Sequence, residues 1–195
     1  MKLKRITAYI LDILFVYFIA AALFMLPIFK NDYKNYMDTT TEYLEYIVTL
    51  GSGEADRDIE LDYVYSISKN SQPLSIITCG LLFLYFGVIA YIFKGQTLGK
   101  KIMKLKVVPD KGKNLDINLF MIRAIILTNL LPKIASIIVL TKLSPSNWLI
   151  AENIISEISN IITFLILGFM IFRDDERGLH DLICKTKVVE SNKEK

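Results

Sequence analysis

The stretch Leu74–Phe93, LSIITCGLLFLYFGVIAYIF, contains no charged residue over twenty positions. An α-helix rises ~1.5 Å per residue, so a run of this length spans the ~30 Å hydrocarbon core of a bilayer. A buried helix of a soluble protein is usually shorter and keeps a polar face, which this run lacks. The stretch therefore predicts a transmembrane helix, and with it a membrane protein.

Three further apolar runs, 6–29, 117–140 and about 151–172, are long enough to cross a bilayer. A cleaved signal peptide is the alternative for the first run, because basic residues precede it, but the run continues well past its small residues Ala20–Ala22. Hydrophobic residues make up 53% of the chain, which agrees with extensive contact with lipid. We predict an all-α fold, a polytopic membrane protein with four transmembrane helices in a single domain, 1–195.

Charge between the runs predicts the orientation. The N-terminal tail carries three basic residues and segment 94–116 has a net charge of +5, whereas segment 30–73 has a net charge of −5. Under the positive-inside rule, 30–73 is extracytoplasmic, and loop 94–116, tail 173–195 and both termini are cytoplasmic, which predicts a multi-pass protein of the cell membrane. The basic face is expected to attract anionic lipid, and the net charge of +3 gives no reason to expect nucleic acid.

Two segments repeat at an offset of 81 residues. Lys104–Val108 (KLKVV) matches Lys185–Val189 (KTKVV), and Gly87 matches Gly168. This spacing favours a duplication in which each half is a hairpin of two helices that starts inside, so that the halves form a parallel repeat. The two lysine-valine segments are also predicted to be short strands that pair with each other. In the outer segment, Thr39–Glu42 resembles a capping box and predicts a helix from there to about Leu50.

Charged side chains inside the predicted spans indicate where a site lies, because each costs at least ~2.5–3.5 kcal/mol in hydrocarbon unless it is paired or hydrated. Asp12 and Arg123 enter at similar depth from the same side, which predicts an ion pair between the first and third helices. Lys133 and Glu157 are expected to pair nearer the outside. These polar groups either hold the helices together or line an ion or proton path. The candidate ion-binding or proton-binding residues are Arg5, Asp12, Arg123, Asn129, Lys133 and Glu157.

No residue pattern indicates an enzyme active site, and we expect no cofactor. The single histidine, His180, lacks a second histidine at a metal-ligand spacing, so no metal site is expected. Cys79 and Cys184 are predicted to lie in a span and in the tail, and so cannot form a disulfide. Gly95–Lys101 ends like a phosphate-binding loop, but its spacing is one residue short.

Three separated motifs, in this order, resemble the RDD family of membrane proteins. They are RITAYILD at Arg5–Asp12, GQTLGK at Gly95–Lys100, and RGLHD at Arg177–Asp181 followed by KVV at 187–189. The family is named for one arginine and two aspartates, which correspond here to Arg5, Asp12 and Asp181. The resemblance covers almost the whole chain except the outer segment, and also marks Gly95, Gly99 and Lys100 as motif residues.

The resemblance implies little about activity, because most members are uncharacterised and some are described as sodium/proton antiporters. We expect a small transporter, a monovalent-cation/proton exchanger that uses Asp12 as its carboxylate. Four spans are few for such a path, so a homodimer is expected. The alternative is a non-transporting membrane scaffold that organises a partner or lipid.

Overall fold

The computed structural model describes residues 1–51, 53, 55–110 and 116–191. Residues 111–115 of the predicted inner loop and 192–195 of the predicted tail lie outside the described residues. The elements, in chain order, are α1 (Lys2–Phe24), the 3-10 turn η1 (Pro27–Phe29), α2 (Lys30–Leu50), α3 (Arg57–Asn70), α4 (Gln72–Phe83), the π-helical turn η2 (Leu84–Ile89), α5 (Ala90–Ile92), α6 (Leu98–Ile102), β1 (Leu105–Pro109), α7 (Ile117–Leu127), α8 (Leu130–Lys142), α9 (Pro145–Phe172), α10 (Leu179–Ile183) and β2 (Thr186–Glu190).

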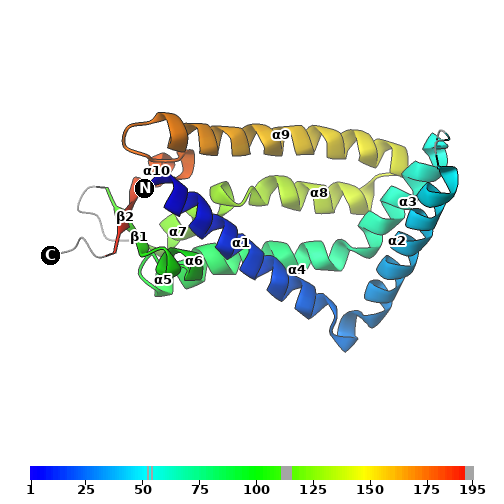
Figure 1. The fold of residues 1–195 in the computed structure, drawn as a ribbon, viewed down its shortest axis with the longest axis horizontal. Helices are drawn as coiled ribbons and strands as arrows, with labels where there is room; N and C mark the ends of the chain where they lie inside the picture. Colours follow the sequence, from blue (N-terminus) through cyan, green and yellow to red (C-terminus); the bar gives the residue numbers. More distant parts are fainter. Residues whose placement is uncertain (52, 54, 111–115, 192–195) are drawn as a thin grey trace.

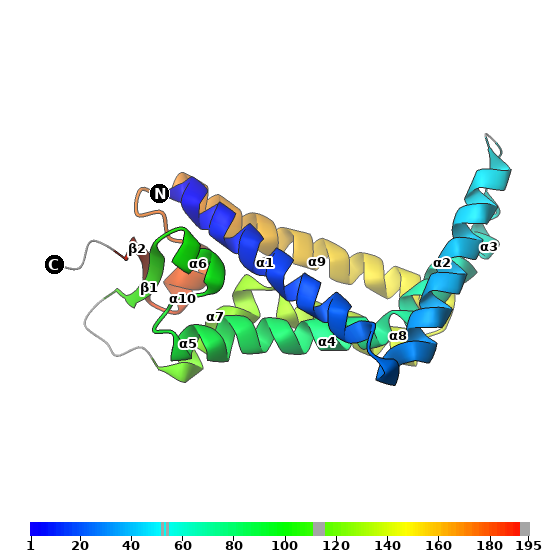
Figure 2. The same cartoon turned by 60° about the horizontal axis from the view of Figure 1, so that its bottom comes forward.

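The molecule is elongated, with α4, α8 and α9 along its long axis and α1 crossing them obliquely (Figure 1). The N-terminus and β2 lie at one end, and α2 and α3 lie together at the other (Figures 1 and 2). The basic and acidic segments that flank the spans are therefore found at opposite ends of the bundle. That the end with the termini faces the cytoplasm stays a prediction, since it rests on the charge pattern.

Three helical stretches, namely α1, residues 72–92 and α9, are long and apolar enough to cross a membrane, and α7 with α8 makes a fourth if the bent pair is counted as one span. Large apolar side chains on their outer faces, such as Phe18 and Phe164, are exposed. Exposed apolar side chains along a whole helix are expected where the neighbour is lipid rather than water. The chain is thus a polytopic, mostly helical membrane protein, as predicted.

The predicted third span is not one straight helix. It breaks at Thr128 and Asn129, and the two parts meet at 63°. Asn129 has φ +51°, in the left-handed region that asparagine tolerates better than most residues. The break also places Pro132 in the first turn of α8, where its missing N–H leaves no helical hydrogen bond unmade.

The second span contains the π-helical turn η2, which buries Tyr85, Phe86 and Gly87. At Gly87 an added Cβ would lie 3.6 Å from the Met121 Cα and 3.8 Å from the Ala124 Cβ, so α7 packs closely against this turn. A π-helical turn shifts the side chains that follow it around the helix axis. Tyr85, at the start of the turn, lies inside the bundle and bonds to Asp12 of α1, as described below.

The outer segment forms a helical hairpin, and the predicted start of its helix is wrong. Helix α2 begins at Lys30, and the hydroxyl groups of Thr39, Thr40 and Thr41 donate to carbonyl oxygens four residues earlier instead of capping a helix. The helix continues through these threonines and does not start at them, because a threonine hydroxyl inside a helix can donate to the backbone carbonyl four residues earlier. The hairpin contacts the bundle through Tyr65, whose ring lies 5.3 Å from that of Trp148.

The two predicted strands exist and pair, so the fold is not strictly all-α. Strands β1 and β2 are antiparallel, with Val107 opposite Val188. Alternate residues of each strand are buried, which is the pattern of a strand with one face on the core.

The offset of 81 that relates the strands also relates α6 to α10. Lys104 and Lys185, which are 81 residues apart, both have positive φ angles. Since the two central residues of the sheet are themselves repeat partners, the strand pair has a local two-fold symmetry. The parallel repeat of whole hairpins stays a prediction.

Candidate functional site

A cluster of buried charges lies at the end of the bundle that holds the termini. Asp181 of α10 is fully buried and accepts from two arginines: Arg5 of α1 through Nη2, and Arg123 of α7 through Nη2 at 2.8 Å. Arg123 also donates to the hydroxyl of Thr186, and Arg5 to the carbonyl oxygen of Glu176. One carboxylate therefore ties α10 to two of the membrane helices.

The predicted ion pair between Asp12 and Arg123 is wrong. The Asp12 carboxylate accepts from the Tyr85 hydroxyl at 2.6 Å, from the Thr97 hydroxyl, and from the Gly99 backbone N–H at 2.7 Å. Asp12 thus satisfies a backbone donor in the first turn of α6, a short helix that the predicted pairing left out. An acid beside the donors of a helix start is stabilised by their partial positive charge.

Close packing of α6 on α1 explains why Gly99 is a glycine. A Cβ at this position would lie 2.2 Å from the carbonyl oxygen of Ala8 and 3.0 Å from the Asp12 carboxyl carbon. Gly95 meets a similar constraint, with a φ of +88° and the carbonyl oxygen of Val107 2.3 Å from an added Cβ. Both motif glycines therefore permit close approach of backbones.

Burial shapes the protonation of the groups around Asp181. Burial alone would raise the pKa of Asp181, but the positive charges of Arg123 and Arg5 hold it well below its ordinary value. Burial lowers the pKa of His180 to about 3, so this histidine is neutral at pH 7. Burial and the charge of Arg123 lower the pKa of Lys100 to about 8. Because His180 is neutral, the cations that bind the Asp181 carboxylate at pH 7 are Arg5 and Arg123.

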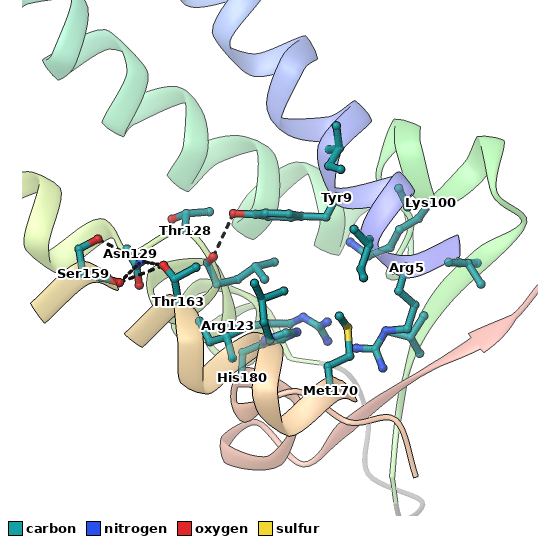
Figure 3. A pocket seen from close by; sticks show the side chains of 18 of the residues that line it. Arg5, Tyr9, Lys100, Arg123, Thr128, Asn129, Ser159, Thr163, Met170 and His180 are labelled. Carbon is teal, nitrogen blue, oxygen red and sulfur yellow. Dashed lines mark hydrogen bonds between the residues drawn. The ribbon is translucent and has the colours of Figure 1, made fainter. Parts of the chain in front are cut away.

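A cavity of about 470 Å³, which we call the termini-side cavity, lies between α1, α7 and α9 and reaches α6, α10 and the sheet. Figure 3 shows Arg5, Arg123 and Lys100 toward one end, and Asn129, Ser159 and Thr163 toward the other. Four basic side chains line it, and within the described part of the chain no carboxylate does. These four are Arg5, Lys100, Arg123 and Lys133.

A second cavity of about 360 Å³, the hairpin-side cavity, lies toward the α2–α3 end of the bundle between α4, α8 and α9. Glu152 lines it and accepts from the Ser136 hydroxyl at 2.7 Å. The two cavities share three lining residues, Tyr17, Lys133 and Ser159. The cavities therefore meet near the break between α7 and α8.

Polar groups at that break bond to neighbouring helices. The Asn129 amide donates to the Ser159 carbonyl oxygen at 3.1 Å and to the Thr163 hydroxyl at 2.7 Å. The Tyr9 hydroxyl donates to the carbonyl oxygen of Leu127, at the end of α7. Such side chains satisfy the backbone and amide groups that a broken helix exposes inside a membrane.

The predicted pair of Lys133 and Glu157 is also wrong, since no hydrogen bond or ion pair joins these two described residues. Lys133 faces both cavities, whereas Glu157 is exposed on α9. The cavity-lining residues of α9 recur at helical spacing as Glu152, Ile155, Ser156, Ser159, Thr163, Ile166, Leu167 and Met170. Glu157 lies about 140° around the helix from the centre of this stripe, because successive helical residues differ by ~100°.

Sequence reasoning missed the donors to Asp12 and the role of the tail. A buried aspartate needs hydrogen-bond donors, and Thr97 stands in a quoted motif, so the motif contained a signal for one of them. Nothing local in the sequence pointed to Tyr85, which reaches Asp12 only through the packing of η2 on α1. His180 lines the termini-side cavity although it was placed in a tail outside the spans.

Comparison with known proteins supports the motif resemblance. The RDD family matches residues 2–185. The uncharacterized protein YxaI of Bacillus subtilis (strain 168) is 28% identical over 117 residues, which cover 60% of this chain and 58% of that protein. No solved structure matches the chain.

Proposed function

We propose that this chain, which belongs to the RDD family of membrane proteins, is a small transporter whose substrate passes through its two cavities. One observation supports this proposal above the others. The termini-side and hairpin-side cavities share Tyr17, Lys133 and Ser159, so two compartments that lie toward opposite ends of the bundle adjoin each other.

The broken helix supports the same proposal. Transporters commonly bind substrate where a membrane helix is interrupted, because the interruption exposes polar backbone groups at depth. Here the interruption at Thr128–Asn129 lies beside the shared lining residues, and α7 and α8 meet at 63°. Under the positive-inside assignment, the termini-side cavity faces the cytoplasm of a cell-membrane protein.

Monovalent-cation/proton exchange at Asp12 is a narrower form of this proposal, and the geometry favours it less. Asp12 is fully buried, lines neither cavity and accepts three hydrogen bonds. A carrier carboxylate has to meet water from each side in turn. The contacts of Asp12 instead suit a positioning residue that holds α6 on α1.

The alternative is a non-transporting protein that organises lipid or a partner. This alternative does not require the two cavities to communicate. We expect a homodimer for the transporter, because four spans are few for a transport path. Light scattering of the detergent-solubilised protein tests the dimer separately.

Thiol accessibility tests the transport path without knowledge of the substrate. In a background with Cys79 and Cys184 replaced by serine, we would introduce Ser159→Cys, at the meeting point of the cavities, and Phe164→Cys, whose side chain is 75% exposed on the outer face of α9. A membrane-impermeant thiol reagent would be added to one side of oriented vesicles at a time.

The transport path predicts that the cysteine at 159 reacts with reagent added from either side, because the shared region opens alternately. The cysteine at 164 should react from neither side, since it faces lipid. Labelling at 159 from a single side, or from none, would contradict a through path and favour the non-transporting alternative.

A further inference from the structure

The termini-side cavity carries an excess of positive charge. Arg5, Lys100 and Arg123 line it, whereas Asp12 and Asp181, the buried carboxylates beside them in the described part of the chain, do not. Lys133 of α8, near the break between α7 and α8, adds a fourth cation. Uncompensated charge at membrane depth is costly, and an anion inside the cavity would remove part of that cost.

The arginines keep donors for such an anion. A guanidinium carries five N–H donors in a planar fork that matches the oxygens of a phosphate or carboxylate. Through their two terminal nitrogens, Arg5 and Arg123 each bond to Asp181 and to one further protein oxygen. Each terminal nitrogen carries a second N–H bond, and both arginines line the cavity (Figure 3).

A buried histidine gives a second, independent indication that a polar ligand occupies the termini-side cavity. His180 lines the cavity, is 3% exposed, and its Nδ1 has no hydrogen-bond partner among the residues that the structure describes. A polar atom buried without a partner costs free energy, so such atoms commonly mark the place of a ligand or water. Because Nε2 lies 3.5 Å from the Asp181 carboxylate and the ring is neutral, Nδ1 is an acceptor, which suits a headgroup hydroxyl or a water beside the phosphate.

The rest of the cavity is apolar and reaches the lipid-facing surface. Ile6, Leu127, Ile166 and Met170 line it, and two further lining residues, Ile10 of α1 and Leu167 of α9, are 50% and 40% exposed. A volume of about 470 Å³ is within the usual ~300–1,000 Å³ of small-molecule sites. This space suits a headgroup and the first part of a chain, while the remainder of the chain leaves between α1 and α9.

We infer that the termini-side cavity is a binding site for an anionic phospholipid, with the phosphate held by Arg5, Arg123 and Lys100 and the acyl chains leaving between α1 and α9. A free phosphate shares the same headgroup chemistry but has no use for the apolar wall. The inference deepens the proposed function by naming a substrate class, and rests on it only for the step of transport.

Binding is measured on the full chain in nanodiscs of phosphatidylcholine, with and without phosphatidylglycerol, by native mass spectrometry of the lipids retained after release. A parallel sample contains inorganic phosphate in pure phosphatidylcholine discs. The variants are Lys100→Met and Lys133→Met, which each remove one cavity cation. The matched control is Lys101→Met, because Lys101 lies on the same short helix but is exposed and does not line this cavity.

The wild type and Lys101→Met should retain phosphatidylglycerol in preference to phosphatidylcholine. Lys100→Met should lose about tenfold of that preference, as expected for one charge-assisted contact, and Lys133→Met, which removes a cavity cation that does not hold the phosphate, should lose a smaller part of it. Equal retention of both lipids by the wild type, or an equal loss in Lys101→Met, would overturn the inference. Displacement of phosphatidylglycerol by inorganic phosphate would assign the site to a free anion instead.

The two proposals fail separately. Selective retention of phosphatidylglycerol together with one-sided labelling at position 159 would leave the lipid site intact and reject transport. Two-sided labelling without lipid selectivity would reject the lipid site and leave the transport path. Because Lys100 and Lys133 lie on different helices, misfolding of one variant still leaves the other to decide.

Discussion

Replacement of Asp181 by asparagine should loosen the end of the bundle that holds the termini. Asp181 is the shared partner of Arg5 and Arg123, which are 8% and 4% exposed. Asparagine keeps the shape of the side chain but removes its negative charge. Two buried guanidinium groups would then lack a counter-charge in a region of low dielectric constant.

The expected magnitude follows from this geometry. Removal of one partner from a buried ion pair costs about 3–5 kcal/mol, most of it from the charge left unpaired. We expect local opening of α10 to become easier by at least about 3 kcal/mol. Since ~1.4 kcal/mol corresponds to a factor of ten, the open fraction should rise at least about 100-fold.

Cys184 provides the assay. It follows α10 directly and is 6% exposed, so a thiol reagent reaches it only when this region opens. With Cys79 replaced by serine, the labelling rate of Cys184 in detergent reports local opening. The control is Asp175→Asn, which removes a carboxylate whose arginine partners, Arg173 and Arg177, lie at the surface.

We expect Asp181→Asn to raise the labelling rate of Cys184 at least about 100-fold and Asp175→Asn to leave it within about twofold. A rate in Asp181→Asn within about threefold of the wild type would refute the reasoning. It would mean that water or lipid already compensates the arginines, so that the carboxylate contributes little to holding α10 in place.

Three further predictions concern other contacts. Asp12→Asn should destabilise the protein by about 1.5–3 kcal/mol in thermal unfolding followed by circular dichroism, because the donors Tyr85, Thr97 and Gly99 lose a charged acceptor, whereas Glu157→Gln should change little. Gly99→Ala should lower the melting temperature, since its Cβ would clash with α1, while Gly80→Ala, with no described atom within 4 Å of the new Cβ, should not. Phosphatidylglycerol retention should weaken as the pH rises through about 8, because Lys100 is charged only below its lowered pKa.

Each of these predictions has a contrary result. Equal melting temperatures for Asp12→Asn and Glu157→Gln would show that the carboxylate does not hold α6 in place. An unaffected Gly99→Ala variant would show that α6 can move away from α1 without cost. Lipid retention that is constant from pH 6 to pH 10 would exclude Lys100 from the site.

Local rules explain what was predictable from the residues alone. Leu74–Phe93 is apolar throughout, and a bilayer admits a helix of that length and composition whatever surrounds it. The strands were predictable because a short segment that ends in Lys-Val-Val, KLKVV and KTKVV, occurs twice at a fixed offset. The family motifs were likewise readable, because they are short, contiguous and in order along the chain.

The partners of the buried charges were not predictable, because partner choice depends on the phase and tilt of several helices at once. Depth along the helix suggested Asp12 with Arg123, but α6 folds back onto α1 and supplies the donors to Asp12. Asp181, nine residues beyond the last predicted span, then binds both arginines.

The amino-acid sequence by itself determined that this chain is a membrane protein of the RDD family, where its apolar segments lie, and which residues carry charge between them. These properties depend on short stretches and on the bilayer, so they survive without knowledge of the packing. Only the tertiary structure decided that the third span breaks, that two cavities meet at Lys133, and that four cations line one of them. A cavity is a property of several helices together, and no single stretch of chain encodes it.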